Sequence, residues 1–129
     1  MSMTAAIERY KSVQVKTSSP GELLLMLYDG LFRFLDEAAE AMRVKDVARV
    51  GDRIGKAHAI LSELAATLNK TAAPELCENL EALYFFCMTR LVEANLHRDE
   101  ERIQEVKRVL DPVREGFHTA VQEASKVNN

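Results

Sequence analysis

The chain has few residues that break regular structure, with three prolines and five glycines among 129 residues. An all-β fold needs many tight turns, which Pro and Gly largely supply, so this composition argues against that class. The sequence also lacks an apolar run of about 18 residues that could span a bilayer. The N-terminal segment lacks the basic start and the continuous apolar run of a signal peptide. We therefore expect a cytoplasmic protein with no membrane insertion.

An excess of positive charge is also missing. The 17 basic and 20 acidic residues give a net charge of −3 and are well mixed along the chain. A nucleic-acid-binding protein normally shows a basic face and a high isoelectric point, so we expect no nucleic-acid partner. The 47% hydrophobic and 29% charged residues are typical of a soluble globular protein. At this length the chain is most simply one domain.

Four segments carry an apolar repeat with alternating steps of three and four residues, which is typical of helices that bury one seam. The segments run from Leu24 to Ala41, from Val47 to Leu68, from Leu76 to Ala94 and from Ile103 to Ala124. The breaks between them are short, and short connections make neighbouring helices antiparallel. The sequence predicts an all-α fold: an antiparallel up-down-up-down four-helix bundle over residues 19–125, about 30 to 35 Å long. Residues 1–18 would form a short N-terminal arm or cap helix.

Typical capping and first-turn residues mark where the helices begin. Hydroxyl and carboxylate side chains cap helix N-termini, proline fits the first helical position, and a glutamate three residues after the cap completes a capping box. The residues that match these roles are Ser19, Pro20, Glu22, Asp46, Pro74 and Asp99.

Three residues disagree with the helical pattern. Pro112 falls inside the fourth repeat, where it removes a backbone hydrogen bond. Because the repeat continues beyond it, we expect a bend near Asp111 rather than the end of the helix. Gly51 and Gly55 lie one turn apart on the second helix. They are either weak points or positions where another helix approaches closely.

No catalytic or metal-binding constellation is evident, so we expect no enzyme activity and no cofactor. The repeat positions are apolar, small or Cys, whereas a di-iron bundle needs inward carboxylates and histidines. The one Glu-x-x-His match, Glu115 to His118, turns Phe117 inward instead. Cys77 and Cys87 lie ten residues apart on one predicted helix, about 15 Å along its axis, too far for a disulfide. We interpret both as small buried thiols.

The sequence contains more apolar residues than one core requires. Leu23 to Tyr28 are all apolar or aromatic, and Leu25, Tyr28 and Phe32 depart from the repeat. Tyr84 to Met88 form an apolar belt around the third helix. Packing against two neighbouring helices explains part of this excess, but Phe85 or Phe86 is hard to bury in one bundle. Exposed apolar surface usually marks a partner site.

The segment before the first helix could cover such a surface. Ile7, Tyr10 and Val13 recur every three residues, and Val13, Val15 and Thr17 then alternate. This segment is too short to fold alone, so it docks on the bundle or stays loose. We therefore predict an apolar arm that competes with a partner helix for one groove.

Two groups of residues resemble the flagellar secretion chaperones called FliS. The first group is fairly specific to that family and comprises Tyr10, Val13, Val15, Thr17, Ser19, Pro20, Glu22, Leu23 and the stretch Met26 to Gly30. The second comprises Asn79, Leu80, Leu83, Tyr84, Met88, Arg90, Leu91, Ala94, Asn95 and Asp99. The resemblance extends from about Tyr10 to Ala120. The chain departs from it at Phe85, where the family often has an acidic residue, and at Phe117, where it commonly has Trp.

This resemblance implies a cytoplasmic chaperone with an antiparallel four-helix bundle fold. It implies binding of the C-terminal segment of newly made flagellin as helices in apolar grooves, which prevents premature polymerisation and aids delivery to the flagellar export apparatus. The helix-in-groove mode agrees with the excess apolar surface. We predict a displaceable cap formed by Ile7, Tyr10, Val13 and Val15, and groove walls formed by Leu25, Tyr28 and Phe85. The alternatives are a self-associating helical bundle without a flagellin client and a metal or small-molecule bundle enzyme. Without its client, the protein would be a monomer or a weak homodimer.

Overall fold

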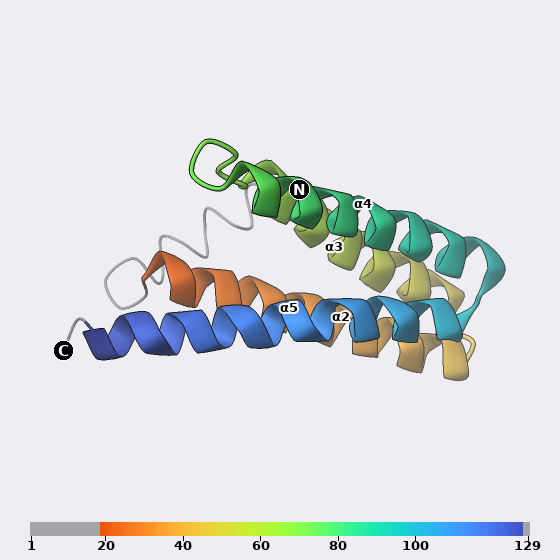
Figure 1. Ribbon diagram of the computed structural model, residues 1–129. Coiled ribbons are helices and arrows are strands. Elements are labelled where there is room, and N and C mark those ends of the chain that lie inside the picture. Colours follow the sequence, from red (N-terminus) through yellow and green to blue (C-terminus); the bar gives the residue numbers. More distant parts are fainter. Residues whose placement is uncertain (1–18, 128–129) are drawn as a thin grey trace.

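The computed structural model describes residues 19–127, and over this range the chain forms four α-helices (Figure 1). The helices are α2 (Pro20–Arg43), α3 (Val47–Ala66), α4 (Pro74–His97) and α5 (Glu100–Val127). No strand occurs in the described range, which confirms the all-α prediction. The predicted arm, residues 1–18, lies outside the described residues.

The helices begin where the capping residues predict. The Ser19 Oγ accepts a hydrogen bond from the Glu22 backbone N–H at 3.1 Å, and Pro20 follows as the first residue of α2. Asp46 caps α3 in the same way, because its Oδ1 accepts from the Arg49 N–H at 3.2 Å. These bonds satisfy backbone donors that have no partner within the helix.

Pro74 opens α4, and Asp99 precedes α5. The Asp99 Oδ1 accepts a hydrogen bond from the Glu101 backbone N–H at 3.0 Å. Local side chains therefore set these two boundaries as well.

The α2–α3 and α4–α5 turns share one design, in which a basic residue has a left-handed backbone and an aspartate follows it. Lys45 has φ 61° and Arg98 has φ 52°. The Asp46 N–H bonds back to the Ala41 carbonyl and the Asp99 N–H to the Ala94 carbonyl. This is the Schellman helix ending, in which glycine is the usual left-handed residue. A residue with a Cβ costs roughly 1 kcal/mol in this conformation.

Ion pairs between α2 and α5 fit an antiparallel arrangement of these two helices. On α2 and α5, Asp29 pairs with Arg114 at 2.5 Å, Asp36 pairs with Lys107, and the Arg43 and Glu100 side chains approach to 2.5 Å. Each step of seven residues forward on α2 is thus matched by seven residues backward on α5. We call these three pairs the α2–α5 ladder.

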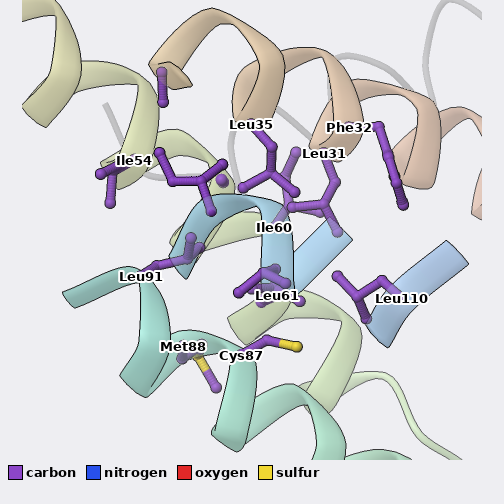
Figure 2. Close-up of a cluster of buried hydrophobic side chains, with 14 of the residues drawn as sticks. Leu31, Phe32, Leu35, Ile54, Ile60, Leu61, Cys87, Met88, Leu91 and Leu110 are labelled. Atoms are coloured by element: carbon purple, nitrogen blue, oxygen red, sulfur yellow. The ribbon is translucent and has the colours of Figure 1, made fainter. Parts of the chain in front are cut away.

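The four helices form a closed ring in which α2 and α4 each contact both α3 and α5. Apolar side chains from all four helices meet in the centre (Figure 2), and no charged side chain is buried among the described residues. The residues labelled there are Leu31, Phe32, Leu35, Ile54, Ile60, Leu61, Cys87, Met88, Leu91 and Leu110. This core holds the ring together by excluding apolar surface from water.

Of the two alternatives for Gly51 and Gly55, the structure favours the weak points, and close helix approach occurs at another glycine. A Cβ on Gly51 or Gly55 would meet nothing within 4 Å, so no described helix approaches them closely. A Cβ on Gly21 would lie only 2.8 Å from the Val121 Cγ2. Gly21 therefore allows the C-terminal part of α5 to pack against the start of α2.

The helix α5 continues through Pro112 to Val127, as predicted, and a bend at Asp111 remains a prediction. The repeat predicts core positions along the whole helix, but the last turns of α5 are exposed. Phe117 is partly buried, whereas Ala120 and Ala124 are exposed. The buried seam therefore ends earlier on α5 than the repeat does.

Candidate partner-binding surface

Helix α4 exposes large apolar side chains on a face that its core-facing residues do not occupy. Leu80, Tyr84, Cys87, Leu91 and Ala94 are among its buried residues. In contrast, Phe85 is 52% exposed, Val92 55% and Leu96 73%. We call these three exposed residues the α4 outer strip.

The spacing of the α4 outer strip places its members on one side of the helix. Val92 follows Phe85 by seven residues and Leu96 follows Val92 by four, and both steps return to the same face of an α-helix. The strip rises about 16 Å from Phe85 to Leu96, which is three helical turns. A soluble domain that leaves such a line of large apolar side chains uncovered usually binds a partner there.

The neighbouring Phe86 lies under a cation and is not part of the strip. The Arg90 guanidinium stacks over the Phe86 ring at 5.1 Å from its centroid. Arg90 is itself held by Glu105 on α5 at 2.7 Å and by Glu93 at 3.3 Å. Because Arg90 covers Phe86, Phe85 is the more exposed of the two phenylalanines that we expected to be hard to bury in one bundle.

Tyr28, which we predicted as a groove wall, belongs to the core instead. Its side chain is 0% exposed, and its hydroxyl lies 2.6 Å from the Tyr84 hydroxyl on α4, with one of the two donating. Its ring packs against Phe117 with centroids 5.7 Å apart. Phe32, which we also expected away from the seam, is buried as well. Tyr28 is therefore not an exposed wall.

Burial makes the tyrosine pair resistant to ionisation. Loss of solvation raises the pKa of both Tyr28 and Tyr84 above the ordinary value, since the charged form is poorly solvated inside the bundle. The bond to Tyr84 raises the pKa of Tyr28 further. The pair thus stays neutral and links α2 to α4 across the core.

The remaining predicted site residues fall into two groups. Leu25 is half-buried, next to Leu24 and Leu27, which pack against the core. The predicted cap residues, Ile7, Tyr10, Val13 and Val15, lie outside the described residues. The roles of Leu25, Phe85 and the cap residues in partner binding remain predictions.

Both cysteines are buried thiols, as predicted. Burial, together with the nearby Glu105, raises the pKa of the Cys87 thiol to about 12, so it stays protonated near neutral pH. The Cys77 Sγ donates to the Asn69 carbonyl at 3.2 Å. Neither thiol has the properties of an activated nucleophile.

Within residues 19–127, no group of three or more His, Cys, Asp or Glu side chains is placed to hold a metal ion. Glu115 and His118, the one Glu-x-x-His match, are both exposed. The helices of the described range contain no segment with the length and hydropathy required to cross a bilayer.

Sequence reasoning missed two members of the α4 outer strip. Val92 and Leu96 look like ordinary apolar residues of a wide helical stripe. The signal that could have identified them is their register with Phe85, seven and eleven residues earlier. Once Phe85 is placed outside the core, the helical period places Val92 and Leu96 there too.

Comparison with known proteins gives the chain a family context. The family model described as "Flagellar protein FliS" matches residues 3–124. The flagellar secretion chaperone FliS of Bacillus subtilis is 36% identical over 91% of this chain and 86% of its own length. The flagellar secretion chaperone FliS of Salmonella typhimurium is 32% identical over 97% of this chain and 96% of its own length. FliSB of Pseudomonas aeruginosa is 34% identical over 87% of this chain and 92% of its own length. The chain therefore belongs to the FliS family of flagellar secretion chaperones.

Proposed function

We propose that this chain is a cytoplasmic, non-catalytic chaperone for flagellin export. In this proposal the α4 outer strip binds the C-terminal segment of flagellin as an amphipathic helix, which prevents premature polymerisation and aids delivery to the flagellar export apparatus. The observation that carries the proposal is the exposure of Phe85, Val92 and Leu96 along one face of α4.

The dimensions and chemistry of the strip support a helical client. Three apolar side chains over about 16 Å match the apolar positions of about three turns of a second helix. Exposed Thr89 and Ala82 lie between and beside the strip residues and add little bulk. A client segment that is disordered before binding would gain its affinity from this apolar contact and lose part of it to ordering.

The N-terminal segment completes the proposal. Residues 1–18 would act as a displaceable cap through Ile7, Tyr10, Val13 and Val15. The half-buried Leu25, in the first turns of α2, would line the groove that the cap leaves.

The first experiment replaces one strip residue and compares it with a matched residue on the same helix. We expect Phe85→Asp to weaken the binding of a flagellin C-terminal peptide about tenfold or more, because a carboxylate would be buried in an apolar contact. The thermal midpoint should stay nearly unchanged, since Phe85 is exposed. Calorimetry with the peptide and thermal unfolding provide the two measurements.

Leu76→Asp is the control, because Leu76 is 56% exposed on the same helix but lies off the strip. Its aspartate would sit in the first turn of α4, where a negative charge is tolerated. We expect neither affinity nor stability to change. If Phe85→Asp binds normally but unfolds easily, Phe85 is a core residue and the proposed site is wrong.

The second experiment removes residues 1–16. A cap that competes with the client contributes no affinity, so the truncated chain should bind the flagellin peptide at least as tightly as the full chain. A clear loss of affinity in the same calorimetric assay would instead mean that the segment contacts the client.

An exposed apolar strip also fits a weak homodimer, which is the basis of the alternative function. Sedimentation of the chain without client should give a monomer, or a dimer that dissociates on dilution. A tight dimer that Phe85→Asp dissociates, together with no binding of flagellin peptide, would favour a self-associating interaction module.

A further inference from the structure

The two turns that contain left-handed residues lie at the same end of the bundle (Figure 1). The α2–α3 turn contains Lys45 and the α4–α5 turn contains Arg98. Arg43, at the end of α2, forms two hydrogen bonds with Glu100, at the start of α5, at 3.1 and 2.5 Å. This contact joins the two turns side by side, away from the end where α2 begins and α5 finishes.

Each turn places a basic side chain next to exposed apolar ones. Lys45 stands between Val44, which is 61% exposed, and Val47, which is 56% exposed. Arg98 follows the exposed Leu96 by two residues. We call Val44, Lys45, Val47, Leu96 and Arg98 the turn-end patch.

The carboxylates around the turn-end patch already have partners within the chain. Glu40 and Glu100 both pair with Arg43. The side chain of Asp46 caps α3, and that of Asp99 caps α5 and pairs with Arg102. The charges left for an external partner are therefore mainly positive.

The cations, in contrast, have no carboxylate partner. Within residues 19–127, the Lys45 ammonium has neither a hydrogen bond nor an ion pair. The Arg98 guanidinium bonds only to Asn95, at its backbone carbonyl and its side-chain oxygen.

Local folding does not require a lysine at position 45. Glycine is the residue that suits a left-handed helix ending, and the Schellman bonds of this turn use only backbone atoms. The positive charge of Lys45 suits the C-terminal end of α2, but its ammonium makes no specific contact within the described residues and stays accessible to an external carboxylate.

From this juxtaposition we propose that the turn-end patch is a second docking surface, for an acidic amphipathic helix of another protein. The apolar face of that helix packs on Val44, Val47 and Leu96, and its flanking carboxylates pair with Lys45 and Arg98. Charge-assisted contacts at the rim of such an interface orient the partner and speed association. This proposal does not depend on the α4 outer strip binding flagellin.

The test uses the full chain, labelled with ¹⁵N, and two synthetic helical peptides of 18 residues as probes. Both peptides carry leucines at positions i, i+3, i+4 and i+7, flanked by glutamates in one and by lysines in the other. We expect the glutamate peptide to shift amide resonances around residues 43–49 and 95–99, and to bind more weakly as salt rises. The lysine peptide should leave these resonances in place. Equal binding of both peptides, or shifts outside the two turns, would overturn the proposal.

Two substitutions separate binding from folding. Lys45→Gly should lower the affinity for the glutamate peptide at least threefold. The thermal midpoint should stay the same or rise, because glycine suits the backbone there. Val47→Asp should lower this affinity about tenfold without loss of stability, since an aspartate in the first turn of α3 suits the helix N-terminus. Unchanged affinity in both variants would refute the proposal.

Two further variants serve as controls. Lys126→Gln removes an exposed cation at the opposite end of the bundle and should leave the affinity for the glutamate peptide unchanged. Phe85→Asp, at the far end of the α4 outer strip from Leu96, should also leave it unchanged, which would show that the glutamate peptide needs only the end of the strip that the turn-end patch shares. Loss of affinity in either control would mean that the glutamate peptide does not bind at the turn-end patch.

Discussion

At the scale of single residues, the buried hydroxyls of Tyr28 and Tyr84 depend on each other for a hydrogen-bond partner. Each hydroxyl is buried, and the two lie 2.6 Å apart on helices that face each other diagonally. A buried hydroxyl without a partner loses its hydration and gains nothing in return. The two tyrosines therefore stabilise the bundle only while both are present.

We expect Tyr28→Phe to lower the free energy of unfolding by about 1–3 kcal/mol, because it leaves the Tyr84 hydroxyl unpaired. The double variant Tyr28→Phe/Tyr84→Phe should lose less than the sum of the single variants, since it removes both polar groups. Urea denaturation of the four proteins measures the coupling. Strictly additive losses would show that the hydroxyls do not depend on each other.

At the scale of the helices, the α2–α5 ladder specifies how the first and last helices align. Its pairs recur every seven residues, and the charges reverse at the third pair, where α2 supplies Arg43 instead of an aspartate. A shift of one heptad would bring Asp36 opposite Glu100 and Asp29 opposite Lys107, or Arg43 opposite Lys107 and Asp36 opposite Arg114. Either shift exchanges three attractive pairs for one attractive and one repulsive pair, so the ladder favours the observed alignment.

Charge exchange tests the middle pair of the ladder. We expect Asp36→Lys to lower the free energy of unfolding by about 0.5–1 kcal/mol, because it places two lysines together near the surface. Adding Lys107→Asp should recover most of the loss, and 1 M NaCl should reduce both effects. Denaturation at low and high salt provides the measurement. A double variant as unstable as the single one would mean that the pair does not contribute through charge.

Local sequence chemistry allowed the helices to be predicted, but not the full packing between them. The capping side chains of Ser19, Asp46 and Asp99 each bond to a backbone N–H two or three residues later. These helix starts can therefore be recognised from the sequence alone. Whether Tyr28 faces the core depends on Tyr84, 56 residues away. The apolar repeat along one helix does not identify such a distant neighbour.

The same limit applies to the glycines and to the candidate site. A glycine allows close helix packing only where a second helix arrives, and Gly21 meets Val121 whereas Gly51 and Gly55 face open space. For the candidate site, an excess of apolar residues on α4 could be predicted. The division between the buried Met88 and the exposed Phe85 depends on which sides α3 and α5 cover.

At the scale of the whole molecule, burial of the tyrosine pair makes stability depend on alkaline pH. The ordinary tyrosine pKa of 10.0 applies to the unfolded chain, and the pKa of both side chains is raised in the folded one. The unfolded chain therefore releases protons above pH 10 that the folded chain retains. The stabilisation is fully present below pH 10 and is lost progressively as the pH rises above it.

We expect the urea midpoint of the natural chain to fall steeply as the pH rises above 10. The double variant Tyr28→Phe/Tyr84→Phe should show a shallower fall, because it removes two groups that ionise only on unfolding. Cys87 contributes in the same direction in both proteins, since its thiol pKa is raised to about 12. Parallel pH profiles for the two proteins would contradict this assignment.

The contact between Gly21 and Val121 has a consequence for attaching other molecules to the chain. It places the start of α2 and the last turns of α5 at one pole of the bundle, and the two left-handed turns at the other. The 24 residues of α2 separate these poles by about 36 Å. A label or tether joined beside either end of the four-helix unit would thus leave the opposite pole unobstructed. A short linker between the two ends would also favour a circularly permuted chain with new termini in the loop between α3 and α4.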